Sequence, residues 1–316
     1  MVLALRETPP LNLAIGAALG LVLLALPFAI YPIFAMQLLI FGLFATAFNL
    51  LIGFGGLVSF GHAAFFGGAA YVSAHAAKVW GLPVELAVIL ATLFAAALGA
   101  LMGAIAIRRQ GIYFAMSTLA LAQMIYFVFL QAPFTGGEDG IQAVPRGHVL
   151  GLISLESDVA MYYTVLALFL AGFWLVWRTI HSPFGQVLKA IRDDEQRAVS
   201  LGYRVERYKL LAFTLSAALA GLAGAIKPIV FQLATLTDVQ WTMSGSVILM
   251  TLLGGLGTVF GPLVGAAFVV TLEHYLAGSA FPVQVALGAI FVLCVLVFRR
   301  GIVGEARAFI TGKGRD

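Results

Sequence analysis

Long apolar runs separated by short polar segments fill most of this chain. A transmembrane helix needs about 20 apolar residues, so each run of that length predicts one crossing of a membrane. The qualifying runs are Leu11–Ile30, Ile33–Ile52, Gly56–Ala77, Val84–Ile107, Gly111–Ala132, Val159–Trp177, Tyr208–Phe231 and Pro282–Phe298. A further apolar stretch, Met243–Ala277, is interrupted by glycines and Pro262, and it predicts a re-entrant segment or a tight hairpin of short helices.

This pattern predicts an all-α fold, a polytopic membrane bundle of 8 to 10 spans in a single transmembrane domain over residues 1–316. Composition agrees, because 62% of the residues are hydrophobic and only 10% are charged, against about 25% charged residues in soluble domains. We therefore expect the lipid bilayer as surroundings, and soluble, disordered and nucleic-acid-binding classes are excluded. The single Cys294 cannot form an internal disulfide.

Basic residues are concentrated on one side of the predicted spans. Short loops rich in Lys and Arg stay in the cytoplasm. With a cytoplasmic N-terminus, only Lys78, Arg146 and Lys227 of the 18 basic residues fall outside. Both termini are therefore predicted to be cytoplasmic, as are a long loop at 178–209 and a basic tail at 299–316. In this arrangement Met243–Ala277 crosses the membrane twice or not at all.

Small residues recur every four positions on two predicted helices. The stripes are Ala91, Ala95, Gly99 and Gly103 on one helix and Ala217, Gly221 and Ala225 on the other. Small residues at this spacing let helix backbones approach closely. The stripes therefore predict a compact bundle with close helix packing.

A weak internal repeat relates residues 55–61, Gly-Gly-Leu-Val-Ser-Phe-Gly, to residues 254–261, Gly-Gly-Leu-Gly-Thr-Val-Phe-Gly. Each copy runs into an apolar helix of small residues. Paired glycine-broken helices in a transporter point to its substrate site, whereas chance similarity is the alternative in a chain rich in Gly and Leu. His62 follows the first copy, and it either lines a substrate path or bonds, as a neutral ring, to a carbonyl freed at the break.

The cytoplasmic loop has the clearest signal for a helix outside the membrane. Ser182 is the predicted N-cap and Pro183 the first helical residue, followed by one helix over Phe184–Leu201 that Gly202 stops. Its imperfect apolar face consists of Val187, Leu188, Ile191, Ala198 and Leu201. The helix is either a solvated or lipid-surface amphipathic helix or a docking helix for a cytoplasmic protein.

The outer loop Thr135-Gly136-Gly137-Glu138-Asp139-Gly140 is acidic and rich in turn residues. It faces the outside, where it could touch an external partner, and its spacing is not that of a calcium loop. The sequence contains no G-x-x-x-x-G-K-[ST] phosphate loop, no H-E-x-x-H and no G-x-S-x-G. We therefore expect no cofactor, no metal and no enzyme activity, and interpret the chain as a conduit without its own energy source.

Several separate motifs in the chain resemble those of a known transporter family. They are the segment 49–67, Gly111-Ile112-Tyr113-Phe114-Ala115-Met116, Thr135-Gly136-Gly137 with Asp139-Gly140, Ser182-Pro183-Phe184-Gly185, Ala190-Ile191-Arg192-Asp193-Asp194-Glu195, Gly202, Gly254-Gly255-Leu256-Gly257-Thr258 and Arg300-Gly301. In this order they resemble the permease subunits of bacterial ABC importers for branched-chain amino acids, most closely the LivM type. The resemblance covers the chain from Phe48 to Gly304.

This resemblance implies a fold, partners and site residues. The fold would be the helical type II importer permease, multi-pass in the bacterial inner membrane. The partners would be a second, homologous permease of the LivH type, two cytoplasmic ATPase subunits and an external substrate-binding protein. The implied ATPase contacts are Gly185, Ala190, Arg192, Glu195 and Gly202. The implied translocation path includes Gly55, Gly56, Ser59, Gly61 and His62, with Gly254, Gly255 and Gly257 as their counterparts.

The mechanism implied by the resemblance is alternating access, driven by ATP binding to subunits that move the cytoplasmic helix. The main alternative is an ion-gradient-driven secondary transporter, which the repeat and the broken helices would suit. Against it, the spans offer few carboxylates for ion coupling, and the large basic loop would have no role. A membrane-embedded hydrolase is disfavoured, because the sequence lacks a convincing nucleophile–base pair. Leucine, isoleucine and valine are the default substrates, although similar permeases carry amides, urea and aromatic-derived acids.

Overall fold

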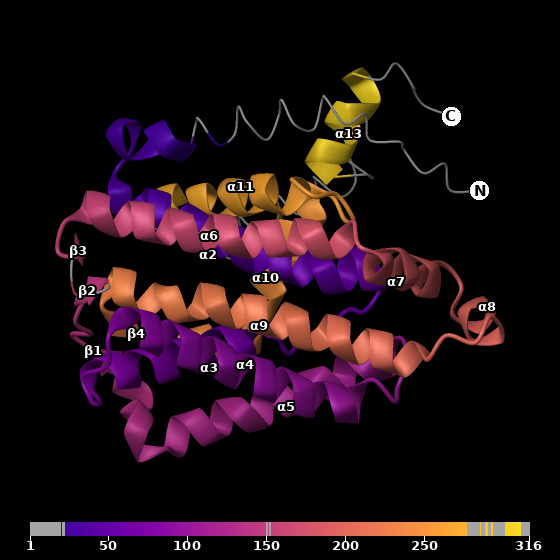
Figure 1. Cartoon of the computed structure of the whole chain (residues 1–316), viewed down its shortest axis with the longest axis horizontal. Helices are drawn as coiled ribbons and strands as arrows, with labels where there is room; N and C mark the ends of the chain where they lie inside the picture. The colour runs from indigo at the N-terminus through magenta and orange to yellow at the C-terminus, as the bar shows by residue number, and fades with distance from the viewer. Residues whose placement is uncertain are drawn as a thin grey trace.

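The computed structural model describes residues 23–149, 151, 153–276 and 301–310, together with Gly20, Val285, Gly288, Ala289 and Val292. These residues form a bundle whose long helices run side by side (Figure 1). The helices α7 (Pro183–Asp193) and α8 (Glu195–Ser200) lie at one end of the bundle, and all the short strands lie at the other. The predicted all-α, polytopic bundle is confirmed.

Helix α2 (Pro32–Asn49) lies in the interior of this bundle. Pro32 occupies its first turn, where the missing N–H would have no helical partner anyway, and most of its apolar side chains are buried. The helix continues as one π-helical turn, η1 (Leu50–Phe54). It packs against α6 (Asp158–Ile180), α9 (Val205–Phe231) and α11 (Gly261–Leu276).

Helices α3 (His62–Lys78), α4 (Val84–Ala106) and α9 form a tightly packed group. The two small-residue stripes face each other here. A methyl group on Gly99 would overlap the Cβ atom of Ala217, and one on Gly221 would overlap the Cβ atom of Ala95. The predicted close packing is confirmed, because neither glycine has room for a side chain.

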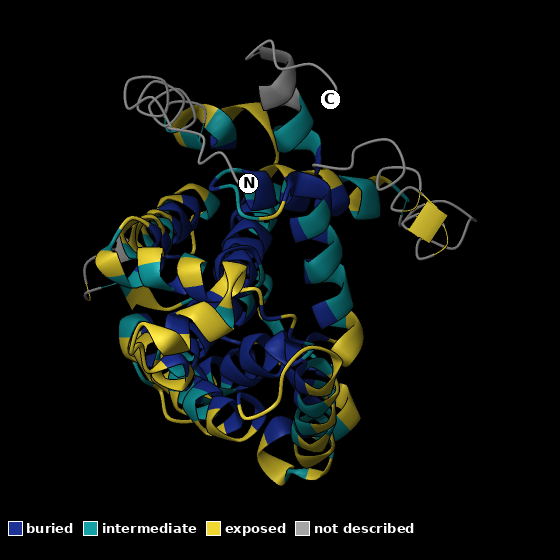
Figure 2. Cartoon of the chain, turned by 90° about the vertical axis from the view of Figure 1, so that its right-hand side faces the viewer, coloured by how far each residue is buried: buried dark blue, intermediate teal, exposed yellow. Residues whose placement is uncertain are grey.

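Helices α5 (Ile112–Gln131) and α6 lie on opposite outer sides of the bundle (Figure 1). Helix α5 exposes large apolar side chains, among them Tyr113, Met116 and Phe127. Buried residues gather in the middle of the bundle and exposed ones at its periphery (Figure 2). An apolar periphery of this kind suits a bilayer or contact with another membrane protein.

The stretch Met243–Ala277 contains two short helices, α10 (Trp241–Gly254) and α11, which pack against each other. Their connection at 255–260 holds Gly255 and Gly257, both at positive φ. A break into short helices at the predicted glycines is therefore confirmed. A further helix, α13 (Gly301–Ile310), packs against both members of this hairpin.

Five helices of the described residues are long and apolar enough to cross a membrane, namely Pro32–Phe54, Val84–Ala106, Ile112–Gln131, Asp158–Ile180 and Val205–Phe231. Each corresponds to a predicted span.

The predicted span Gly56–Ala77 is wrong in its first part, because residues 56–61 are not helical and α3 begins only at His62. The positive φ of Gly56 departs from helical geometry at this point. Of the predicted span Leu11–Ile30, the helical residues 23–29 are described. The span Pro282–Phe298 lies outside the described residues, apart from single positions.

The end of the bundle opposite α7 carries two short antiparallel strand pairs. Strand β1 (Ile141–Gln142) pairs with β4 (Leu233–Ala234), and β2 (His148–Val149) pairs with β3 (Ile153–Ser154).

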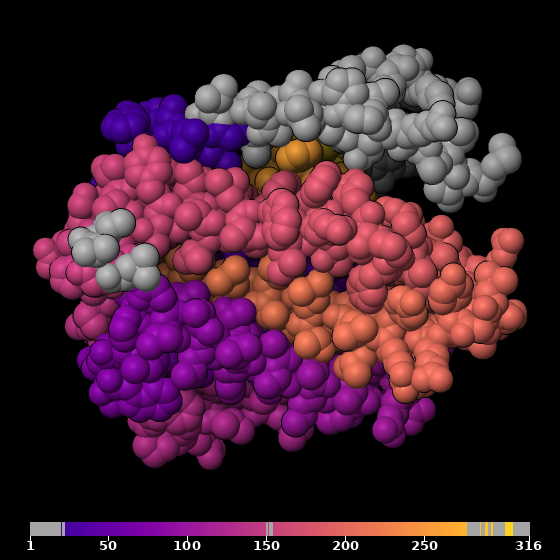
Figure 3. Space-filling view, viewed as in Figure 1, coloured from indigo at the N-terminus to yellow at the C-terminus, as the bar shows by residue number. Residues whose placement is uncertain are grey.

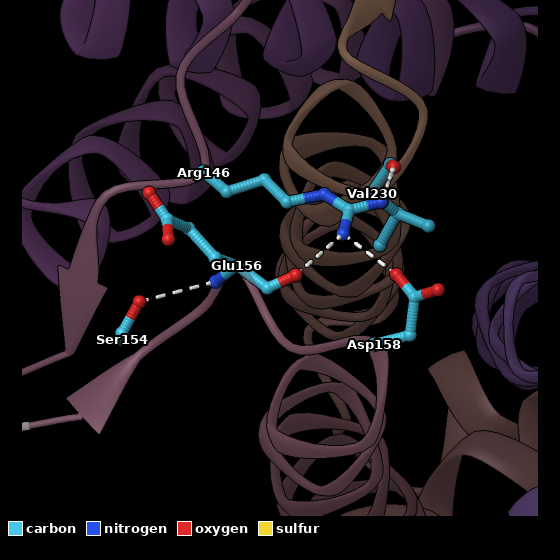
Figure 4. A network of polar contacts seen from close by, with 5 residues as sticks. All are labelled: Arg146, Ser154, Glu156, Asp158 and Val230. Atoms are coloured by element: carbon cyan, nitrogen blue, oxygen red, sulfur yellow. Dashed lines mark hydrogen bonds and ion pairs between the residues drawn. The ribbon is translucent and has the colours of Figure 1, made fainter.

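Arg146 fixes this end to the bundle (Figure 4). Its Nη1 donates to Asp158 Oδ1 at 2.7 Å and to the Glu156 carbonyl at 3.4 Å, while its Nη2 donates to the Val230 carbonyl at 3.3 Å. The segment between β1 and β2 is thereby attached to the start of α6 and to the end of α9.

Candidate functional site

The two glycine breaks of the repeat lie against each other. Gly53, in η1, is so close to the 255–260 connection that a methyl group on it would lie 2.6 Å from the backbone nitrogen of Gly257. Asn49 holds the contact, because its Nδ2 donates to the Thr258 carbonyl at 2.8 Å and its Oδ1 accepts from the Gly257 N–H at 3.0 Å. We call Asn49, Gly53, Gly56 and Gly257 the glycine joint.

Helix α7 packs directly on the glycine joint. The Nη1 of Arg192 donates to the Gly53 carbonyl at 2.5 Å. Gly56 has φ +70°, and a methyl group there would lie 2.7 Å from Arg192 Cγ. One turn earlier, Leu188 lies against Gly55, and the Lys189 ammonium lies 5.4 Å from the centre of the Phe54 ring. One face of α7 is therefore attached to the end of η1.

The second break also meets the C-terminal helix α13. A methyl group on Gly301 would lie 2.5 Å from the Cα atom of Gly255, and one on Gly254 would overlap the carbonyl of Gly261. Gly254 and Gly255 thus allow backbone-to-backbone contact within the hairpin and with α13. Glycine is required at these positions because a side chain would overlap the neighbouring backbone.

His62 lies away from the glycine joint, at the start of α3. Its ring is fully buried among Phe48, Phe65 and Phe213, and its Nε2 lies 2.9 Å from the Ser216 hydroxyl. Because Ser216 donates its proton to the Ala47 carbonyl at 2.6 Å, Nε2 is the donor in this pair. The ring therefore ties α3 to α9 through a hydroxyl group, and the carbonyl freed at the break is taken by Arg192 instead.

The other two residues expected near His62 also have local structural partners. Ser59 is fully buried, and its hydroxyl accepts from the Gly61 N–H at 3.1 Å. A methyl group on Gly61 would lie 3.1 Å from the Met102 methyl group. The start of α3 is completed by Ser244 of α10, whose hydroxyl accepts from the Ala63 N–H at 2.8 Å.

The loop at 178–209 forms two helices, so the predicted single helix Phe184–Leu201 is wrong. Asp194 is extended, with φ −156° and ψ +101°, and its side chain accepts from the Arg197 N–H as the N-cap of α8. The predicted N-cap Ser182 is confirmed, because its hydroxyl accepts from the Gly185 N–H at 3.3 Å. Gly202 has φ +86°, as expected of a residue that ends a helix.

Three of the five residues implied as ATPase contacts bond to or pack against other parts of this chain. Gly185 is buried where a side chain would overlap the carbonyls at the end of α6. Arg192 bonds to the Gly53 carbonyl, and the Glu195 carboxylate pairs with Lys209 at 2.7 Å. Ala190 and Gly202 are exposed, and Arg192 is exposed as well although it bonds to Gly53.

The far end of this loop exposes an apolar patch that the sequence pattern did not predict. Val199, Leu201 and Tyr203 are 57%, 70% and 41% exposed, and we call them the loop tip. Leu201 was expected on the inward apolar face, but the break at Asp194 turns α8 relative to α7. The loop protrudes at the right-hand end of the molecule in Figure 3.

The loop at 135–140, predicted to face the outside, bonds to backbone groups at the end of α5 and within itself. The Thr135 hydroxyl bonds to the carbonyls of Phe129 and Ala132, both at 2.6 Å, and accepts from the Gly137 N–H at 3.4 Å. Gly136 and Gly140 have φ of +75° and +67°, and a side chain on Gly140 would overlap the Ala234 carbonyl of β4. Asp139 is exposed.

Near the outer end of α9, Lys227 forms an ion pair with Asp238 of η4 (Leu236–Asp238). The Asp238 side chain is only 1% exposed, and its second oxygen accepts from the Thr235 hydroxyl at 3.2 Å. Lys227 therefore has a buried acidic partner within the chain. Among the described residues, no group of three His, Cys, Asp or Glu side chains could hold a metal ion.

The structure brings together five of the eight implied path residues, Gly55, Gly56, Gly254, Gly255 and Gly257, at or beside the glycine joint and α7. It places Ser59, Gly61 and His62 at the start of α3. The sequence analysis missed the partnership of Asn49 and Arg192 with this joint. The only available signal was their position, with Asn49 one turn before Gly53 and Arg192 in the last turn of α7.

The Asn49 bonds allow a direct test of the glycine joint. We expect Asn49→Ala to lower the free energy of unfolding by about 2–4 kcal/mol, because two partly buried backbone groups, the Gly257 N–H and the Thr258 carbonyl, would lose their partners. Thr46→Val is the matched control, since the equally buried Thr46 hydroxyl bonds only to Gly42 of its own helix. Thermal unfolding in detergent measures both variants, and equal melting temperatures would contradict this role of Asn49.

Comparison with known proteins agrees with this geometry. The family model described as "Branched-chain amino acid transport system / permease component" matches residues 30–299. The chain is 27% identical to the high-affinity branched-chain amino acid transport system permease protein LivM of Escherichia coli (strain K12), over 85% of this chain and 69% of that protein. It is 29% identical to the ribose import permease protein RbsC of Bacillus subtilis (strain 168), over 57% of this chain and 58% of that protein. No solved structure matches the chain.

The fold and the glycine joint define a polytopic helical membrane permease. More particularly, the chain belongs to the family of permease components of branched-chain amino acid transport systems. The predicted resemblance to the LivM type is confirmed by identity over most of the chain.

Proposed function

We propose that the chain moves branched-chain amino acids inward by alternating access, as one permease of an ABC importer in a bacterial inner membrane. Its partners are a second, homologous permease, two cytoplasmic ATPase subunits and an external binding protein. Both termini lie in the cytoplasm. The family supports the class of transport system, and the observation that carries the coupling is the exposed loop tip.

The loop tip has the character of a docking surface. Val199, Leu201 and Tyr203 are exposed on a loop that contains basic residues and protrudes from the bundle (Figure 3). Exposed apolar side chains with a polar rim are typical of protein interfaces. In our proposal this tip contacts the ATPase directly, together with Ala190 and Gly202. Gly185, Arg192 and Glu195 instead hold the loop in place through their contacts with α6, Gly53 and Lys209.

The opposite end of the bundle would receive the binding protein. The loop at 135–140 is held rigidly against β4 and exposes Asp139. A preformed loop binds at a lower entropic cost than a flexible one. The substrate path would pass the start of α3, between Ser59, Gly61, His62 and the glycine joint.

The docking role of the loop tip can be tested by placing the same negative charge at the tip and at a control position outside it. We expect Leu201→Asp to lower ATPase co-purification and ATP-dependent uptake about tenfold or more, since a buried interface anchor contributes about 2 kcal/mol or more. Gln196→Asp adds the same charge to an exposed polar position of α8, and we expect wild-type values. Pull-down from the native membrane and uptake in proteoliposomes measure both quantities.

The same preparation tests the alternative. If the wild-type chain purifies alone and carries solute without ATP, the importer proposal fails and an ion-gradient-driven transporter replaces it. If Leu201→Asp retains full ATPase binding, the loop tip is not the docking surface.

A further inference from the structure

One charged side chain of α7, Arg192, bonds to the backbone of the bundle. The Arg192 guanidinium donates to the Gly53 carbonyl at 2.5 Å through Nη1, while its Nε and Nη2 donate to Asp193 Oδ1 at 3.2 and 2.9 Å. Gly53 lies in the last turn of a helix, where carbonyls lack an intrahelical donor. A charge-assisted bond to such a carbonyl is stronger than a neutral one.

The carbonyl that accepts the hydrogen bond from Arg192 belongs to Gly53 of the glycine joint. Gly257 sits on the other side, where a methyl group would lie 3.2 Å from the Gly53 oxygen and 3.6 Å from Arg192 Nη1. Asn49 ties Gly257 to α2. The guanidinium therefore bonds to the first glycine break and lies beside the second, and the Asn49–Gly257 bond that joins the two breaks links residues 208 apart in the sequence.

We propose that Arg192 is a positioning residue, which transmits movement of α7 to the ends of α2 and α10 instead of contacting the ATPase. This inference rests on the proposed function and names the joint through which that function is coupled. A displacement of α7 pulls on the Gly53 carbonyl, which belongs to a π-helical turn, and such turns are frequent at functional sites. The ATPase contact stays with the exposed loop tip.

The test separates docking from transmission in the reconstituted complex with both permeases and both ATPase subunits. For Arg192→Ala we expect unchanged ATPase co-purification and continued ATP hydrolysis, with the substrate moved per ATP lowered about tenfold, within the range of coupling between two sites. Arg192→Lys keeps one donor for the Gly53 carbonyl, so we expect an intermediate ratio, about threefold below wild type. Arg197→Ala, an exposed arginine of α8, should retain the wild-type ratio.

Gly56→Ala provides an independent variant, because it displaces Arg192 without removing the charge. We expect it to lower the ratio as Arg192→Ala does. Wild-type ratios in Arg192→Ala, or in Arg192→Lys if the alanine variant does not fold, would overturn the inference while leaving the importer proposal intact. Loss of ATPase binding in either variant would also overturn it, because Arg192 would then be a docking residue. Solute transport by the wild-type complex without ATP would instead overturn the proposed function.

Discussion

Gly224→Ala is expected to prevent α3 and α9 from packing at their native separation. A methyl group on Gly224 would overlap the carbonyl oxygen of Phe66 and lie 2.7 Å from its carbonyl carbon. Both atoms belong to the backbone of α3, so no side-chain rotation relieves the overlap. Overpacking in a core costs about 1–3 kcal/mol and more where the backbone must move, so we expect a loss of at least about 3 kcal/mol.

Gly245→Ala is the matched control for this substitution. Gly245 is also a helical glycine, in α10, but nothing lies within 4 Å of a methyl group there. Alanine at such a position gains about 0.5–1 kcal/mol from helix propensity. Size-exclusion chromatography and thermal unfolding in detergent compare the two variants. Similar melting temperatures for both would contradict the assignment of Gly224 as a packing residue.

Local patterns predicted the features of the fold that depend on neighbouring residues. The stripes containing Gly99 and Gly221 indicated close helix packing, because a four-residue spacing alone places them on one helix face. The N-cap at Ser182 and the break within 243–277 follow from local rules in the same way. Even there, the prediction ran α3 back to Gly56, because apolar composition does not show where a positive φ interrupts a helix.

The candidate site depends on contacts that no local pattern contains. Arg192 and Gly53 are 139 residues apart, and Asn49 and Gly257 are 208 apart. The resemblance placed Arg192 among the implied ATPase contacts. The structure shows that it bonds to the Gly53 carbonyl of η1, and the position of that carbonyl is visible only in three dimensions.

The ion pair of Lys227 and Asp238 is the second place where one substitution should have a large effect. The Asp238 side chain is 1% exposed and that of Lys227 is 17% exposed. A methyl group on Gly67 would lie 2.6 Å from the Val239 nitrogen, so the end of η4 packs closely against α3. Removing one partner of a buried pair leaves an uncompensated charge, which costs about 3–5 kcal/mol. We expect Lys227→Met to lose stability by this amount.

A double-mutant cycle separates the energy of the ion pair from the other effects of removing the lysine. Asp238→Asn removes the negative charge and keeps an oxygen that can accept from Thr235. In Lys227→Met combined with Asp238→Asn, no unpaired charge remains, and we expect most of the lost stability to return, with a coupling energy of about 2 kcal/mol or more. Thermal unfolding of the four proteins gives this energy. If the two single effects simply add, the lysine acts without Asp238, and η4 is held against α3 by packing at Gly67 and Val239 alone.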